Sequence, residues 1–96
     1  MAIAYKKLSK EEEQIYNGVR RALKRSRPPF VVGWDVELGQ DSADQPAVWI
    51  SLKIDRRLKL TKPELDQIDK VARLIKAEIF RQEVGREPYV RLRTAA

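Results

Sequence analysis

The chain has 96 residues, enough for one domain with a single core, and its 20 Lys and Arg exceed 14 Asp and Glu for a formal charge of +6. It contains neither cysteine nor histidine, which excludes disulfides and thiolate chemistry, nearly all zinc sites, and the usual general base near neutral pH. No apolar run is long enough for a signal peptide or a membrane span, so we expect a cytoplasmic protein.

The first predicted helix begins at Ser9. Ser9 and Glu12 have the S-x-x-E spacing of a capping box, in which each residue satisfies a free amide of the other. Apolar residues at helical spacing then form one stripe for the core: Ile15, Val19, Ala22 and Leu23. Gly18 weakens the middle of this helix and is a candidate for a close approach to another backbone. The helix ends in a basic run before Pro28-Pro29.

Two strands are predicted next, because the apolar period changes from helical spacing to two. The first starts at Val31 and places Trp34, Val36 and Leu38 on one side and Asp35 and Glu37 on the other. The second covers 47–54 and places Val48, Ile50, Leu52 and Ile54 on one side and Trp49, Ser51 and Lys53 on the other. Residues 39–46 are rich in turn formers, and we expect them to form an exposed, mobile connection.

A second helix is predicted from Thr61, with a second capping box closed by Glu64 and with Pro63 in the first turn. Its apolar stripe comprises Leu65, Ile68, Ala72, Ile75 and Ile79, widened by Val71 and Phe80. Gly85 is the predicted C-cap, and Pro88 prevents continuation. A last strand, residues 89–93, directs Val90 and Leu92 to the core.

The fold prediction is α+β: a two-layer α-β-β-α-β sandwich, with a three-stranded sheet and two helices on one face. Each helix has a single apolar stripe to bury, so both must cover the same face of the sheet. The whole chain, 1–96, forms one domain, with 1–8 and 94–96 expected to be flexible. The last strand can lie beside either member of the strand pair, so the strand order stays open.

The open sheet face carries the main candidate site. Its candidate binding residues are Trp49, Tyr89, Lys53, Arg91 and Arg93. Three interpretations compete: a single-stranded nucleic acid stacks on the rings, a second copy of the chain covers them, or the rings merely pack on each other and on arginine stems. Asp35 and Glu37 would repel phosphates. We therefore expect a non-enzymatic interaction module that binds a protein partner or itself through this face.

The alternative is nucleic-acid binding through two basic clusters, if the fold brings them together. The candidate phosphate contacts are Arg20, Arg21, Lys24, Arg56 and Arg57, and the same clusters include Arg25, Arg27, Lys59 and Lys62. Solvated helix ends account for such charges equally well. We expect no catalytic residues, metal site, cofactor or small-molecule substrate, because the chain has no phosphate loop, dinucleotide fingerprint or zinc signature. Asp41 and Asp44 are too few ligands for calcium.

The element order over residues 9–93 and the basic surface resemble the type II KH-like fold, including the ribosome-binding factor A proteins, which bind the small ribosomal subunit during its maturation. This resemblance implies an RNA-associated protein. The G-x-x-G turn of KH domains is missing, since its expected region, 68–73, reads Ile-Asp-Lys-Val-Ala-Arg. The order also resembles the cytoplasmic domain of cation diffusion facilitators, without that family's metal-binding histidines. The strings at 45–50 and 87–94 resemble a group of small stand-alone prokaryotic proteins of uncharacterised function, a resemblance that implies no activity.

Overall fold

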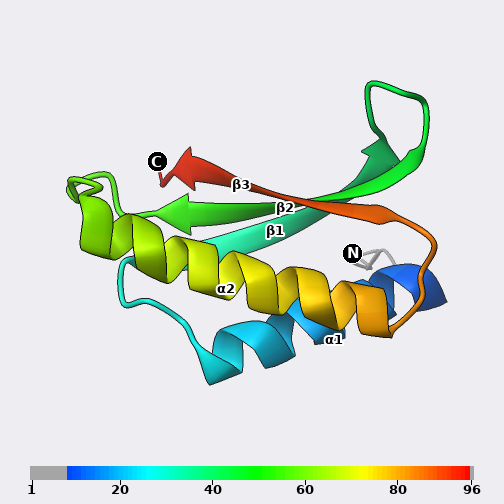
Figure 1. Cartoon of the computed structure of the whole chain (residues 1–96), viewed down its shortest axis with the longest axis horizontal. Coiled ribbons are helices and arrows are strands. Elements are labelled where there is room, and N and C mark those ends of the chain that lie inside the picture. The colour runs from blue at the N-terminus through cyan, green and yellow to red at the C-terminus, as the bar shows by residue number, and fades with distance from the viewer. Residues whose placement is uncertain (1–8, 96) are drawn as a thin grey trace, which may run out of the picture.

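The structure is a computed structural model and describes residues 9–95. Its elements are α1 (Lys10–Arg25), β1 (Val31–Gln40), β2 (Pro46–Ile54), α2 (Lys62–Arg81) and β3 (Glu87–Thr94), as Figure 1 shows. The predicted α+β class and the α-β-β-α-β order are confirmed. Within residues 9–95, neither helix combines the length and the apolar character that crossing a membrane requires.

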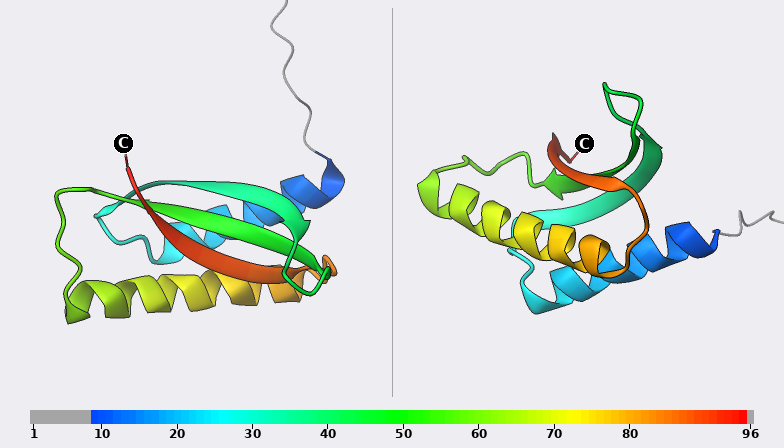
Figure 2. Two further views of the ribbon diagram at one scale, coloured as in Figure 1. Left: turned by 90° about the horizontal axis from the view of Figure 1, so that it is seen from above. Right: turned by 45° about the vertical axis from the view of Figure 1, so that its right-hand side comes forward.

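The three strands form one mixed sheet with β2 at its centre. β1 pairs with β2 in antiparallel orientation, and β3 pairs with β2 in parallel orientation. This settles the strand order that the sequence left open. A parallel neighbour requires a long crossover, and α2 provides it. Both helices lie on one face of the sheet, as predicted, while the β1–β2 hairpin rises on the other side (Figures 1 and 2).

The core lies between the sheet and the helices. β2 contributes the side chains predicted for its helix-facing side, and α1 contributes its whole predicted stripe. In β3, Val90 packs against the core as predicted, but Leu92 is 39% exposed on this edge strand, so its predicted place in the core is wrong. In α2 the stripe is shifted: Ile68, Val71, Ile75 and Ile79 are buried, but Leu65 and Phe80 are 47% and 56% exposed. At 100° per residue, Leu65 and Phe80 lie on the flank of α2 opposite to Glu78, which contacts α1. The prediction that they belong to the core stripe is wrong for this reason.

The helix N-termini differ from each other. At α1 the capping box is confirmed, since the Glu12 amide donates to Ser9 Oγ at 3.1 Å and the Ser9 amide donates to Glu12 Oε1 at 3.3 Å. At α2 Thr61 is the N-cap, but its side chain caps no helix amide. Its hydroxyl instead donates to the Glu64 carboxylate, a charge-assisted bond that lowers the pKa of Glu64. The second predicted capping box is therefore wrong.

The end of α2 also differs from the prediction. The helix ends at Arg81, with Gln82 as C-cap, because Glu83 adopts a left-handed φ of 51°. Gly85, the predicted C-cap, lies further on in the link to β3, with a φ of 73°. Both strands of the hairpin are longer than expected, so only 41–45 connects them. At the C-terminal end of β3, within the segment 94–96 that was expected to be flexible, the amide of Ala95 donates to the Ile54 carbonyl oxygen at 2.8 Å.

The two helices contact each other through polar and small residues. The carboxylate of Glu78, in a side chain only 10% exposed, pairs with Arg21 of α1 at 3.2 Å and with Arg81 at 2.7 Å. Burial raises the pKa of Glu78, but hydrogen bonds from Arg81 and Arg21 outweigh burial and lower it overall. The close approach expected at Gly18 is present, although its neighbours are the side chains of Gln82 and Glu78 rather than a backbone.

Arg86 joins three elements at one end of the sheet. One of its terminal nitrogens donates to the carbonyl oxygens of Gly39 and Ala47, at 2.9 and 3.1 Å. Its Nε pairs with the Glu11 carboxylate in the first turn of α1. The side chain is 23% exposed, so these contacts are largely shielded from water. Arg86 thereby ties α1, β1 and β2 to the start of β3.

Candidate functional site

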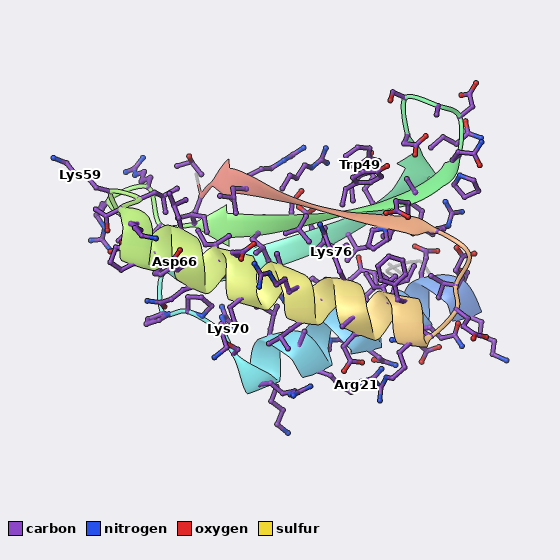
Figure 3. All side chains as sticks on the ribbon, viewed as in Figure 1. Arg21, Trp49, Lys59, Asp66, Lys70 and Lys76 are labelled. Atoms are coloured by element: carbon purple, nitrogen blue, oxygen red, sulfur yellow. The ribbon has the colours of Figure 1, made fainter. Side chains whose placement is uncertain are left out.

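The open sheet face brings the five predicted binding residues together. In the strand register, Glu37, Trp49 and Tyr89 form one row across the sheet, and Asp35, Ser51 and Arg91 form the next. Lys53 and Arg93 follow in a third row with Gly33. In Figure 3, Trp49 lies on the side of the sheet opposite to the helices. Neither α1 nor α2 covers the Trp49 or Tyr89 ring, because both helices lie on the other face of the sheet.

The two aromatic rings of this face stack on each other. The centroids of Trp49 and Tyr89 are 4.6 Å apart, with an angle of 21° between the ring planes. The Arg91 guanidinium lies over the indole, 5.5 Å from its centroid. Both aromatic side chains are half-buried. Trp49 of β2 and Tyr89 and Arg91 of β3 thus form an aromatic and cationic cluster.

Arg91 is held in place by two further contacts. Its Nε donates to Ser51 Oγ at 2.8 Å, and a terminal nitrogen pairs with Glu37 at 3.0 Å. Ser51 is fully buried although it lies on the open face. Lys53 pairs with Asp35 at 3.9 Å. Among residues 9–95, Arg93 forms no ion pair. The intramolecular packing that the third interpretation describes is therefore present, and it neutralises two of the three cations.

Asp41 links the hairpin tip to the aromatic cluster. The Tyr89 hydroxyl donates to Asp41 Oδ2 at 3.0 Å, while the amides of Ala43 and Gln45 donate to Oδ1 at 2.9 and 3.0 Å. The pKa of Asp41 is lowered, first by the Gln45 amide, and the pKa of Tyr89 is raised, first by the bond to Asp41. The connection 41–45, part of the segment 39–46 that was expected to be mobile, is thus bonded to itself and to β3.

The basic residues proposed for nucleic acid are not gathered at one place. Arg21 pairs with Glu78, and Arg57 pairs with Asp55 at 3.1 Å, which lowers the pKa of Asp55. Arg56 and Arg57 line a hollow of about 350 Å³. Arg20 and Lys24 line a different hollow, together with Leu23, Arg27 and Trp34. The two clusters therefore border separate hollows.

A basic groove runs along the C-terminal half of α1, and part of it was missed by the sequence analysis. A hollow of about 490 Å³ lies between this end of α1 and α2. It shares Leu23, Lys24 and Arg27 with the hollow of about 230 Å³ beside Trp34. Gln67 and Lys70 of α2 complete it. No sequence signal connects Lys70 with Arg25, because their proximity depends on how the helices pack.

Acidic residues border a further hollow, of about 500 Å³, between the hairpin tip and the α2–β3 link. Asp41, Glu83 and Glu87 line it, but the pKa of Asp41 is lowered, whereas proton transfer near neutral pH needs a carboxyl group with a raised pKa. Among residues 9–95, no group of three or more His, Cys, Asp or Glu side chains is placed to hold a metal ion.

Comparison with known proteins identifies no relative. No family model matches the chain, and no curated protein matches it. Of the resemblances found in the sequence, the structure supports the shared α-β-β-α-β order and nothing more specific. Membership in the KH-like or small prokaryotic groups is a proposal.

Proposed function

We propose that this protein is a non-enzymatic interaction module whose open sheet face binds a second copy of the chain. The cluster of Trp49, Tyr89 and Arg91 carries this proposal. Tryptophan, tyrosine and arginine dominate the residues that contribute most to protein–protein binding energy. A half-buried stack on an uncovered sheet face leaves apolar ring surface in water, which a partner would remove from water.

The cluster is already ordered in one protomer, which favours binding. Its three side chains are fixed by the ring stack, by Ser51 and Glu37 on Arg91, and by Asp41 on Tyr89. Ordering a flexible side chain at an interface costs about 0.5–1.5 kcal/mol. Much of that cost is met when the chain folds, so more of the contact energy remains for association.

The charges of this face favour a second copy over an unrelated protein. Asp35 and Glu37 lie on β1, and Arg91 and Arg93 lie on β3, at the opposite edge. A two-fold axis along β2 would place the acidic strand of one copy over the basic strand of the other. The same axis would bring the two Trp49 rings together at the centre. The face is complementary to itself in this arrangement.

The area of the face indicates weak association. Three strands about 4.8 Å apart and about 25 Å long present roughly 400 Å² per copy, half of the roughly 800 Å² of a standard interface. We expect dimers at high micromolar concentration, and a weaker dimer at high salt because Asp35 and Arg93 are exposed or half-exposed.

Sedimentation equilibrium over a range of concentrations tests this proposal. The wild type should associate, and Trp49→Ala should remain monomeric under the same conditions. Phe80→Ala is the matched control, because Phe80 is an aromatic residue 56% exposed on α2, away from the open face. A monomeric wild type at high micromolar concentration, or an equal loss in Phe80→Ala, would reject the proposal.

The RNA-associated KH-like alternative stays a second proposal. It is supported by the element order and the net charge of +6. Four of its five phosphate candidates are divided between two hollows, and two of the five, Arg21 and Arg57, form ion pairs. Filter binding to structured RNA would reject it if charge reversal of Arg56 and Arg57 leaves the affinity unchanged.

A further inference from the structure

We infer that the basic groove, formed by two adjoining hollows around the C-terminal end of α1, binds the phosphodiester backbone of a single-stranded nucleic acid and stacks a base on Trp34. This surface is separate from the open sheet face, so the inference does not depend on self-association. Five cationic residues line the groove: Arg20, Lys24, Arg25, Arg27 and Lys70. No Asp or Glu lines either of its two hollows.

The charge of the groove is not compensated by neighbouring residues. In the part of the chain that the structure describes, none of the five cations forms an ion pair, whereas eight other cations do. Arg27 Nε donates to the Val31 carbonyl oxygen, and Arg20 donates to Asn17 Oδ1. Both acceptors are uncharged, so neither hydrogen bond neutralises its arginine. Like charges gathered at one hollow repel one another, and an anion that binds there relieves the repulsion.

The helix dipole explains only part of this cluster. Lys24 and Arg25 lie in the last turn of α1, where the free carbonyl groups favour cations. Lys70 lies in the middle of α2, and Arg20 lies more than one turn before the end of α1. The dipole effect is confined to the last turn, so it does not account for these two residues. In Figure 3, Lys70 lies on the side of α2 toward the C-terminal end of α1.

Trp34 indicates which anion fits the groove. Its ring is half-buried, with one part packed against the core and near Tyr16, at a centroid distance of 5.4 Å, while the ring also lines the smaller hollow beside Arg20, Lys24 and Arg27. An aromatic ring at the end of a run of cations is typical of proteins that bind single strands, where bases stack on rings and phosphates contact Lys and Arg. An acidic peptide would use the cations but would not need the indole.

Fluorescence anisotropy with short labelled oligouridine and oligothymidine tests the inference at stepped salt concentrations. Both strands should bind at low salt, with a slope of log K against log salt of about −3 if four to five phosphates each contribute roughly −0.7. Lys24→Glu/Lys70→Glu should weaken binding at least tenfold. Tighter binding of oligouridine than of oligothymidine would assign the groove to RNA. Equal binding of the two would show that the groove accepts single-stranded RNA and DNA alike.

Lys10→Glu/Lys76→Glu is the matched control, because both lysines are exposed, unpaired within residues 9–95, absent from the groove lining and outside both basic clusters. This variant changes the net charge by the same amount, and it should bind both oligonucleotides with close to the wild-type affinity. No binding at low salt, or an equal loss in this control, would overturn the inference. If polyglutamate binds as tightly and is equally sensitive to Lys24→Glu/Lys70→Glu, the ligand is an acidic protein instead.

Trp34 fluorescence tests the stacking step separately. The chain has two tryptophans, so Trp49→Phe leaves Trp34 as the only indole. Oligouridine should quench its emission in parallel with the anisotropy change, because a stacked base contacts the ring. Emission unchanged at saturation would overturn the role of Trp34.

Discussion

Tyr89 and Asp41 form the residue-scale contact most open to measurement. The bond from the Tyr89 hydroxyl to Asp41 raises the pKa of Tyr89 and lowers that of Asp41. A raised pKa means that the folded state holds the proton more tightly, so this stabilisation is present below about pH 10 and is lost as the pH rises through the folded-state pKa. The lowered pKa of Asp41 has the opposite sign: its contribution is present above about pH 4 and is lost in acid.

We predict that Asp41→Asn returns the pKa of Tyr89 toward the ordinary value of about 10, because the carboxylate charge that opposes ionisation is removed. Spectrophotometric titration of tyrosinate measures this, and the difference between the wild type and Tyr89→Phe assigns the signal among the three tyrosines. An unchanged Tyr89 titration in Asp41→Asn would show that the hydrogen bond is not formed in solution.

At the scale of elements, Gly18 sets how closely α1 packs on α2. A Cβ at this position would overlap the side-chain amide nitrogen of Gln82, which is buried and has no hydrogen-bond partner among residues 9–95. In a helix interior, alanine is more favourable than glycine by about 1 kcal/mol of helix propensity. The overlapping atom is the end of a flexible side chain, so the balance depends on whether Gln82 can move.

We predict that Gly18→Ala raises the free energy of unfolding by about 1 kcal/mol in a Gln82→Ala background, and by less in the wild type. Urea denaturation of the four variants of this double-mutant cycle measures both values. Destabilisation of similar size in the two backgrounds would mean that the contact that excludes a Cβ is not with Gln82.

At the scale of the whole molecule, Arg86 connects the helical layer to the sheet. It bonds two carbonyl oxygens of the β1–β2 pair and the Glu11 carboxylate. Lysine has no planar fork and cannot make these contacts together. We therefore predict that Arg86→Lys lowers the free energy of unfolding by about 2 kcal/mol, the order expected for charged hydrogen bonds shielded from water.

Chemical denaturation measures this loss, and Arg73→Lys is the control, because Arg73 makes an exposed helix-surface pair with Asp69 at 2.7 Å. Such pairs contribute only about 0.3–0.5 kcal/mol. The Arg86→Lys transition should stay cooperative, since the residue joins parts of one core. A loss no larger than that of Arg73→Lys would contradict the prediction.

Much of the open face was predictable from periodicity, but its contacts were not. A period of two places Trp49, Lys53 and Arg91 on one face without any knowledge of their neighbours. The stacking of Trp49 on Tyr89 requires β3 to lie beside β2, and these residues are 40 positions apart. The second capping box failed because the Thr61 hydroxyl had an alternative partner in the Glu64 carboxylate.

The sequence by itself determined the kind of each element, the buried faces of α1 and β2, and the absence of cysteine and histidine chemistry, because these follow from residue identity and from spacing over a few positions. Only the tertiary structure decided that β3 joins β2, that Arg86 meets Gly39 and Ala47, and that Lys70 joins the cations at the end of α1. Those contacts join segments distant in the chain, and they are set by how the helices pack on the sheet and on each other.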